Sequence, residues 1–391
     1  MNKKKMIICG ATGINNSGDE AILDVLILQY QELFDITVIS INPDVARKYH
    51  ANVNFIKISD RKVCMTYIRE CDVFLLGGGG LFQDETSVFN IIRWAQILVL
   101  GKKYSKHTIL YANSIGPLKY KFSRLICKKV LNKMDFIILR DSKSYGLIQK
   151  LGINVPTEVT VDPVFSYPVN KGIKEENIYK LPSKYVAISI RHWYDSVPVL
   201  PAKVSNKLCI HTKKYNHYIS VIREITTYIN KELKMPVVFI SFMPERDKAV
   251  AEKVLHTEFL NSNNYIIEDS SKNVLPTDFL RIIDKAEFLV GMRLHSLIYA
   301  VDMQTPFIAI DYSDKVNGLI KDLEMTEYSI PVEELSLDIF KRKYQFLVEN
   351  RKAIASKLIA QSAEMRMREK KNKQLILQVL EGEQRHVFEK L

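Results

Sequence analysis

The sequence lacks the cysteine patterns that mark two large classes of protein. Its five cysteines are an odd number spread along 391 residues, and no two of them form a CxxC pair. Disulfide frameworks and zinc sites both need cysteines at short, regular spacings, so neither is expected here. Several of the cysteines lie in apolar stretches, which is typical of buried, reduced thiols in a cytosolic protein. We expect no metal site.

Long apolar runs are also missing. The chain opens with three lysines, but the apolar run after them, Met6 to Cys9, is too short for a secretory signal, and no later run approaches the length of a membrane span. Low-complexity tracts and internal repeats are absent as well. We therefore expect a cytoplasmic protein, for which contact with the inner face of a membrane remains open.

Acidic residues are too few to balance the basic ones. The formal net charge is +12, which indicates an anionic partner without choosing between nucleic acid, a phosphorylated metabolite and a lipid headgroup. No zinc-knuckle spacing or aromatic-basic signature accompanies the lysines, so we do not expect nucleic acid as a partner. The basic clusters at 102–106, 119–133 and 366–373 are interpreted by default as solvated helix faces.

Short apolar runs alternate with helical periodicity along most of the chain, which predicts βαβ units. In the first half we expect strands at residues 5–9, 35–41, 53–58, 71–76, 108–111 and 136–139. The second half repeats the pattern, with strands expected at residues 185–190, 237–242, 265–268, 288–290 and 307–310.

This alternation predicts an α/β protein with two doubly wound, Rossmann-like domains facing each other across a cleft. The first domain covers residues 1–170 and the second residues 183–330. Between them, residues 171–182 are polar and lysine-rich and form the expected linker. Residues 331–391 are helical by period, with packing on the body as the default and a lipid surface as the alternative.

Two glycine-rich segments follow buried strands of the first half. The segment from Gly10 to Glu20 has the composition of a phosphate-binding turn, although it matches neither a P-loop nor GxGxxG. Ser17 or Asp19 is expected to cap the helix after it. Four consecutive glycines after residue 76 predict a loop that cradles a ligand. From these segments we predict the substrate-binding residues Gly13, Asn16, Asp19, Gly78, Gly79, Gly80 and Asp84.

Cationic side chains stand at other strand ends. Arg140 follows one apolar run, and Arg293 and His295 follow another, where a strand leads into a helix. Arginine binds carboxylate or phosphate through two hydrogen bonds, whereas lysine supplies a point charge, so these residues with Lys315 suit a ligand that carries both anions. A salt bridge would explain Arg140 equally well, and a lone histidine in an apolar stretch is more often structural.

Taken together, the motifs resemble those of the polysaccharide pyruvyl transferases. The resemblance rests on residues 15–20 with the glycines before them, on 77–84, 115–118, 140–142 and 162–163, and above all on Gly291-Met292-Arg293-Leu294-His295 with residues 312–316. It covers Lys5 to about Leu323. The sequence differs from the usual family pattern at residues 112–114 and 242–244.

The resemblance implies a fold like that of the GT-B glycosyltransferases. It also implies transfer of a pyruvyl group from phosphoenolpyruvate to two hydroxyls of a sugar in a bacterial surface polysaccharide or its lipid-linked precursor, which forms a ketal and releases phosphate. Phosphoenolpyruvate is then a donor substrate, and no cofactor is expected. Arg140, His295 and Lys315 take the places of the family's functional residues, with Arg293 and Ser296 beside them as substrate-binding residues. Asp19, Asp84 or Asp314 would be the base that deprotonates the acceptor.

Two other functions remain open from the sequence. A GT-B-type glycosyltransferase using a nucleotide-sugar donor would have the same architecture, because fold does not fix function. A non-catalytic anion- or lipid-binding protein of the envelope machinery would also account for the cationic strand ends. The sequence leaves the acceptor sugar and the oligomeric state undefined.

Overall fold

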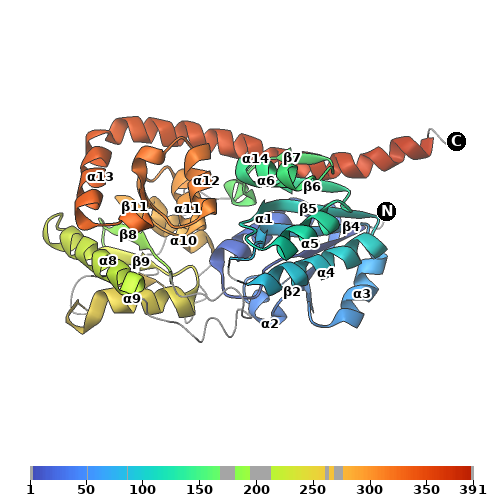
Figure 1. The fold of residues 1–391 in the computed structure, drawn as a ribbon, viewed down its shortest axis with the longest axis horizontal. Helices are drawn as coiled ribbons and strands as arrows, with labels where there is room; N and C mark the ends of the chain where they lie inside the picture. Colours follow the sequence, from blue (N-terminus) through green and yellow to red (C-terminus); the bar gives the residue numbers. More distant parts are fainter. Residues whose placement is uncertain are drawn as a thin grey trace.

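A computed structural model describes residues 3–50, 52–85, 87–167, 181–193, 213–259, 264–267 and 276–388 of the chain. These residues form two α/β domains side by side, with a long C-terminal helix running along both (Figure 1). The predicted linker lies outside the described residues except for its last two positions. Among the described residues, no helix is both long and apolar enough to cross a membrane.

The first domain is built on a seven-stranded sheet in the order β3-β2-β1-β4-β5-β6-β7, and every neighbouring pair is parallel. Its strands are β1 (Lys4–Cys9), β2 (Phe34–Ser40), β3 (Asn54–Lys57), β4 (Val73–Phe82), β5 (His107–Ile115), β6 (Phe136–Leu139) and β7 (Thr157–Val159). Its helices are α1 (Ser17–Tyr30), α2 (Pro43–Ala46), α3 (Arg61–Glu70), α4 (Val88–Tyr104), α5 (Lys121–Leu131), α6 (Ser142–Leu151) and the 3₁₀ turn η1 (Pro163–Ser166).

The second domain repeats this plan with a six-stranded parallel sheet in the order β10-β9-β8-β11-β12-β13. Its strands are β8 (Val186–Ser189), β9 (Val237–Ile240), β10 (Tyr265–Ile267), β11 (Phe288–Gly291), β12 (Phe307–Asp311) and β13 (Ser329–Pro331). Its helices are α8 (Lys213–Lys231), α9 (Pro244–Phe259), α10 (Pro276–Asp284), α11 (Leu294–Met303), α12 (Asp314–Asp322), α13 (Leu337–Glu349) and the 3₁₀ turns η2 (Thr326–Tyr328) and η3 (Val332–Glu334).

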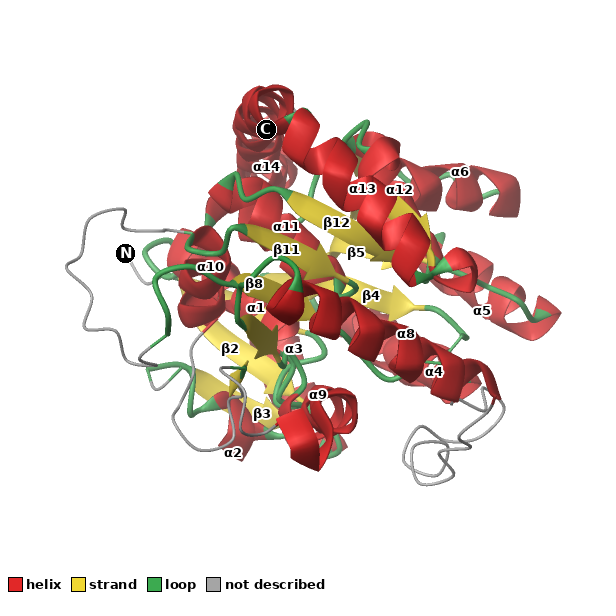
Figure 2. Ribbon diagram, turned by 90° about the vertical axis from the view of Figure 1, so that its left-hand side faces the viewer, coloured by secondary structure: helices red, strands yellow, loops and turns green. Residues whose placement is uncertain are grey.

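Both sheets are doubly wound, with helices on both faces (Figure 2). The strand order reverses between β1 and β4 in the first domain and between β8 and β11 in the second. At such a reversal the connecting loops diverge, which leaves a crevice at the carboxyl ends of the strands where ligands bind. The predicted two-domain α/β architecture is therefore confirmed.

The alternating pattern of β1 explains how the first sheet joins two hydrophobic cores. Successive side chains of a strand point to opposite faces of the sheet. Ile7 and Cys9 pack with apolar residues of α3, α4 and α5 on one face. Met6 and Ile8 belong to the cluster on the other face, which is continuous with the core of the second domain. The α1 face of the sheet is thus the one that meets the second domain.

Two predicted strand ends are wrong. β4 was expected to stop at Leu76 and release its glycines into a loop, but the strand continues through them to Phe82. Gly78 and Gly79 have φ values of 62° and 82°, and the register against β5 shifts between Gly79 and Phe82. Glycine adopts these left-handed angles without strain, so the strand bends and still keeps its ladder with β5, which is itself longer than predicted.

Two further predictions need correction. The helix α1 is capped by Asn16, whose side chain accepts a hydrogen bond from the Gly18 amide, and not by Ser17 or Asp19, which both lie in its first turn. The predicted last strand of the second sheet, β12, pairs on its outer side with β13. The short β13 was missed because three residues carry almost no periodic signal.

The C-terminal helical segment packs on the body, as expected by default. It divides at Asn350 into α13 and the 38-residue helix α14 (Arg351–Phe388), which is about 57 Å long at 1.5 Å per residue. Its buried residues Ile354 and Leu358 lie toward the second domain, whereas Asn372 contacts the first. The Asn372 side chain accepts a hydrogen bond from Thr160 Oγ1 at 2.6 Å and donates one to the Val161 carbonyl at 3.3 Å.

Candidate active site

Residues of both domains meet where the carboxyl ends of the two sheets face each other. The Ser17 amide at the start of α1 donates a 3.0 Å hydrogen bond to the Phe242 carbonyl of the second domain. Lys143 and Asp314 form an ion pair across the same boundary. The structure therefore has the two domains in contact, and side chains from one reach groups of the other.

Arg140 is the last cation before α6 and is almost completely buried. Its Nε donates a 2.7 Å hydrogen bond to Ser114 Oγ, and its Nη1 forms an ion pair with Asp162. The adjacent Asp141 caps α6 by accepting a hydrogen bond from the Ser144 amide at 2.7 Å. The guanidinium of Arg140 is thus held at the strand ends by two groups of its own domain.

His295 reaches the first domain from the first turn of α11. Its ring lies against Gly18, where an added Cβ would come within 2.1 Å of Nδ1. Its Nε2 is 3.7 Å from Asp162 Oδ2, is buried, and has no hydrogen-bond partner among the described residues. Burial lowers the pKa of His295 to about 4, with the cations Arg140, Arg293 and Lys315 adding to the effect and Asp162 opposing it. The imidazole is neutral at pH 7 in this state.

Lys315, in the first turn of α12, also crosses to the first domain. Its Nζ lies 3.5 Å from the Gly80 carbonyl, and a Cβ at Gly80 would come within 1.7 Å of it. Glycine at this end of β4 therefore leaves the space that the ammonium group occupies. Burial and the nearby charge of Arg140 lower the pKa of Lys315 to about 8, while Glu85, Asp141 and Asp19 act in the opposite direction.

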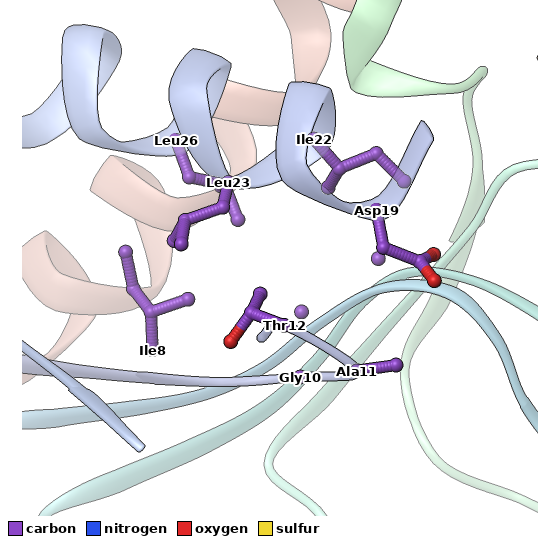
Figure 3. A pocket seen from close by; sticks show the side chains of 10 residues that line it. Ile8, Gly10, Ala11, Thr12, Asp19, Ile22, Leu23 and Leu26 are labelled. Atoms are coloured by element: carbon purple, nitrogen blue, oxygen red, sulfur yellow. The ribbon is translucent and has the colours of Figure 1, made fainter. Parts of the chain in front are cut away.

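Asp19 lines a pocket between β1, β4 and α1, with Gly10, Thr12 and Gly77 among its neighbours. Figure 3 shows Asp19 below the first turn of α1, at the end of this pocket opposite Ile8. Its Oδ2 accepts a 2.6 Å hydrogen bond from Asn16 Nδ2. Burial and the neighbouring Glu20 raise the pKa of Asp19 to about 7, against the opposing charges of Arg140 and Lys315. This carboxylate titrates near neutral pH beside two cations.

A larger pocket lies between the domains. Polar groups from three parts of the chain line it. The first domain supplies Arg140 and Asp162, the second domain Lys315, and α14 Arg368. The Arg368 Nη2 donates a 2.9 Å hydrogen bond to the Thr160 carbonyl, which holds the side chain at this boundary. The C-terminal helix therefore contributes a cation to the interdomain pocket.

Several predicted substrate-binding residues are engaged by the protein itself. Arg293 pairs with the buried Asp247 through two hydrogen bonds, of which Nε to Oδ2 is 2.9 Å. Both carboxylate oxygens of Asp84 accept backbone hydrogen bonds, from Lys119 at 2.8 Å and from Tyr120 at 2.9 Å. These two side chains stabilise the strand-end loops, so their hydrogen-bonding groups are already used within the protein.

The remaining predicted residues lie close to the site and have structural contacts as well. The Gly13 amide donates a 2.7 Å hydrogen bond to buried Glu20, and the Ser296 hydroxyl donates one of 2.6 Å to the Arg293 carbonyl. Gly79 lies against Asp19, where an added Cβ would be 3.1 Å from Oδ1. Of the three candidate bases, Asp19 alone lines one of the pockets described above. Asp84 accepts backbone hydrogen bonds, and Asp314 is exposed in its ion pair with Lys143.

Three residues near the site were not predicted to have a role. Asp162 was noted only within residues 162–163 of the family resemblance, yet it contacts both Arg140 and His295. Ser114 lies in an unpredicted extension of β5. Arg191, just after β8, donates a 2.6 Å hydrogen bond to the Tyr312 hydroxyl and lies 4.7 Å over its ring. Its position at a strand end was the available signal, the same one that identified Arg140.

The arrangement can bind a small dianionic ligand and move protons near it. Arg140 and Lys315 supply two positive charges, and His295 has a buried ring nitrogen free to donate or accept a proton. Among the described residues, no three histidine, cysteine, aspartate or glutamate side chains are grouped so that they could hold a metal ion.

Comparisons with known proteins give a family and a fold. A family model described as polysaccharide pyruvyl transferase matches residues 16–314. The amylovoran biosynthesis protein AmsJ of Erwinia amylovora is 23% identical over an alignment of 283 residues, and the match covers 68% of this chain and 63% of AmsJ. The match thus spans less than two thirds of that relative.

Solved structures with the same architecture have little sequence in common with this chain. A Listeria monocytogenes structure described as a UDP-N-acetylglucosamine 2-epimerase has a TM-score of 0.64 at 12% identity, covering 99% of this chain and 98% of that one. HepE of Anabaena in complex with UDP-glucose has a TM-score of 0.59 at 11% identity, covering 97% and 99%. At such identities the likeness shows the fold alone, a GT-B-like arrangement of two α/β domains.

Proposed function

Since the chain belongs to the polysaccharide pyruvyl transferase family, we propose that it transfers the pyruvyl group of phosphoenolpyruvate to two hydroxyls of a sugar. The products are a cyclic ketal and inorganic phosphate. The observation that supports this reaction most directly is the meeting of Arg140, His295 and Lys315 from two domains beside Asp19.

The donor matches the charges of the site. Phosphoenolpyruvate carries a carboxylate and a phosphate on one small enol, so it needs two cationic groups close together. Arg140 and Lys315 line one pocket, Arg140 buried and Lys315 partly buried, and a charge-assisted hydrogen bond is stronger there than in water. Phosphate departure adds negative charge, which the same two cations stabilise.

His295 is the proposed general acid. Its pKa of about 4 makes it neutral before the donor binds, and an anionic donor placed beside it raises that pKa because the charged imidazolium is then stabilised. The proton on Nε2 goes to the methylene carbon of the enol as a sugar hydroxyl adds to the neighbouring carbon. Phosphate then leaves with its bonding electron pair, and the second hydroxyl closes the ketal.

Asp19 is the proposed base for the acceptor. A carboxylate with a pKa near 7 accepts a proton from the incoming hydroxyl more readily than an ordinary aspartate does. Its hydrogen bond from Asn16 fixes the orientation of the carboxylate. Each hydroxyl loses one proton: one proton is retained as the new methyl hydrogen, and the other leaves with phosphate or solvent.

The reaction needs no cofactor and no metal in this proposal, because the anions are matched by protein cations. Purified protein is expected to keep its full rate with phosphoenolpyruvate in excess chelator. A rate that is lost with chelator and restored by a divalent cation would refute this part of the proposal.

The acceptor is proposed to be a bacterial surface glycan or its lipid-linked precursor. AmsJ is named for the biosynthesis of a polysaccharide, amylovoran, and the match to it is partial. A cytoplasmic site facing the inner surface of the membrane would give access to a lipid-linked sugar.

One alternative is favoured by the fold comparison. HepE was solved with UDP-glucose, so a glycosyltransferase or another enzyme acting on a nucleotide-sugar is the competing proposal for this chain.

The deciding experiment incubates the protein with phosphoenolpyruvate and a panel of lipid-linked and synthetic glycosides. Phosphate release that depends on the acceptor, with the mass gain of a pyruvyl ketal, is the expected result. A parallel series with nucleotide-sugars is the control. Glycosyl transfer or epimerisation there, together with no phosphate release from phosphoenolpyruvate, would replace the first proposal with the second.

A further inference from the structure

A long basic stretch forms the outer helices of the first domain. Residues 86–134 contain ten lysines and arginines and no aspartate or glutamate. They build α4 and α5, which lie side by side on the face of the sheet that points away from the second domain (Figures 1 and 2). Such a separation of charge attracts an anionic surface.

The cations of α5 are available. In this stretch Lys102 pairs with Asp135 and Lys106 with Asp72. By contrast, Lys121, Lys129 and Lys133 are exposed, and none of them has a carboxylate within 4.0 Å among the residues that the structure describes.

Large apolar side chains are exposed beside these lysines. Phe122 is 58% exposed and Leu125 50% exposed, and they lie three positions apart on α5, so they share a face with Lys129. Tyr120, which precedes the helix, and Phe89, in the first turn of α4, are exposed as well. Exposed phenylalanine and leucine side chains at the centre of a lysine-rich face gain nothing from contact with water. They indicate a surface that binds another molecule. We call Phe89, Tyr120, Lys121, Phe122, Leu125 and Lys129 the α4–α5 patch.

We infer that the α4–α5 patch docks the protein on an anionic lipid bilayer. A helix that lies in the membrane interface combines lysines, which contact lipid headgroups, with phenylalanine and leucine side chains that enter the acyl boundary. A nucleic acid would match the lysines but would give Phe122 and Leu125 no apolar environment. The combination therefore favours a bilayer over a polyanion.

The patch is close to the active site. It begins at the N-terminal ends of α4 and α5, which follow the carboxyl ends of β4 and β5, and extends along α5 to Lys129 in its last turn. Asp84 holds the two regions together by accepting hydrogen bonds from the amides of Lys119 and Tyr120. Glu85 beside it pairs with Lys119 at 3.9 Å and also acts on the charge of Lys315. Docking through the patch would therefore place the carboxyl edge of β4, where Lys315 contacts Gly80, near the membrane surface.

This inference deepens the proposed function and rests on it for the lipid-linked acceptor. Docking itself can be measured without turnover. The test is flotation of the purified full chain with vesicles of phosphatidylcholine alone and of phosphatidylcholine mixed with phosphatidylglycerol. We expect the wild type to float with the anionic vesicles, to stay behind with the neutral ones and to be released by salt.

Two double variants test the patch. F122S/L125S is expected to bind anionic vesicles at least about tenfold more weakly, and K121Q/K129Q about thirtyfold more weakly at low salt. The matched control is I359S/M367S, which removes two exposed apolar side chains from α14 and is expected to bind like the wild type. Unchanged thermal unfolding will show that all three variants are folded.

Three results would overturn the inference: equal flotation with neutral and anionic vesicles, wild-type binding by F122S/L125S, or loss of binding in I359S/M367S instead. Retained binding by F122S/L125S with loss in K121Q/K129Q would mean a general polyanion site. Turnover of a soluble acceptor by F122S/L125S separates the two proposals, because it reports on the proposed function alone.

Discussion

The chemistry of each site residue depends on how deeply it is buried and on which groups pair with it. The buried guanidinium of Arg140 is paired with Asp162 and donates a hydrogen bond to Ser114. His295 has no hydrogen-bond partner on Nε2 within the described part of the chain, and burial lowers its pKa to about 4, so it is neutral. A ligand that brings negative charge therefore favours the protonated form of His295.

Replacing His295 tests the general acid directly. His295→Gln keeps a polar side chain of similar size but cannot deliver a proton, so kcat is expected to fall about 10²–10⁴-fold. Binding of phosphoenolpyruvate, measured by calorimetry, should stay within a few-fold of the wild type because Arg140 and Lys315 remain. His217→Gln, at an exposed position of α8, is the control. A His295→Gln variant with normal turnover would remove His295 from the mechanism.

Of the three site groups with shifted pKa values, Asp19 and Lys315 titrate near neutral pH, where they set the pH dependence of kcat/KM, whereas the pKa of His295 lies well below that range. Asp19 must be deprotonated to act as a base, so the rate rises as the pH passes about 7. Lys315 must be protonated to bind the anion, so the rate falls as the pH passes about 8. Together they predict a narrow bell-shaped profile for the free enzyme.

Lys315→Arg separates the two limbs of that profile. Because a guanidinium stays charged across the whole range, the alkaline decline should move to higher pH while the acidic limb near 7 is unchanged. Initial rates in a series of buffers at constant ionic strength provide the measurement. An alkaline limb that does not move in Lys315→Arg would assign that limb to another group.

Among the secondary-structure elements, β4 and α1 make room for side chains of the other domain. The carboxyl end of β4 offers Lys315 a surface without a Cβ at Gly80, and the start of α1 offers the same to His295 at Gly18. Both contacts exist only when the domains are in contact. Glycine at these two positions is thus required for packing between the domains.

Gly80→Ala tests this requirement. The added methyl group would stand 1.7 Å from the Lys315 ammonium, so the side chain must move and kcat/KM is expected to drop at least about tenfold. The free energy of unfolding should change little, because the end of a lysine side chain moves easily. Gly146→Ala is the matched control: nothing lies within 4 Å of its added Cβ, and a helical alanine stabilises by about 0.5–1 kcal/mol. Equal activities of the two variants would contradict the role of Gly80.

At the scale of the whole molecule, α14 connects the two domains along their length. It is anchored to the second domain through Arg366, which pairs with buried Asp302, and to the first through Gln29, which donates a hydrogen bond to Glu369. The same helix places Arg368 in the interdomain pocket. The relative position of the two sheets, and with it the site, depends on this helix.

Ile376→Ala tests the anchoring of α14. Ile376 is fully buried, so truncation removes buried methyl groups and leaves a cavity, which is expected to lower the free energy of unfolding by about 2–5 kcal/mol. Ile359 lies on the same helix but is 54% exposed, and Ile359→Ala should stay within about 0.5 kcal/mol of the wild type. Chemical denaturation followed by circular dichroism gives both values. Equal effects at the two positions would show that α14 is not held through Ile376.

The sequence by itself determined most of the strands, their alternation with helices and the two-domain plan, but missed the short edge strands β7 and β13. Apolar runs and helical periods are local signals, and they placed Arg140, His295 and Lys315 correctly at strand ends. The same local signals failed where pairing between strands decides, as at the glycines of β4, which remain in the ladder because β5 lies beside them.

Only the tertiary structure decided which charges face a ligand. Arg293 and Arg140 look alike in sequence, yet Arg293 is paired through two hydrogen bonds with Asp247, whereas Arg140 shares Asp162 with a histidine of the other domain. Residues 162 and 295 are far apart along the chain, and electrostatic interactions depend on distance in space. No periodic pattern carries that information, so the partners and the pKa values of the site emerge only when the two domains are brought together.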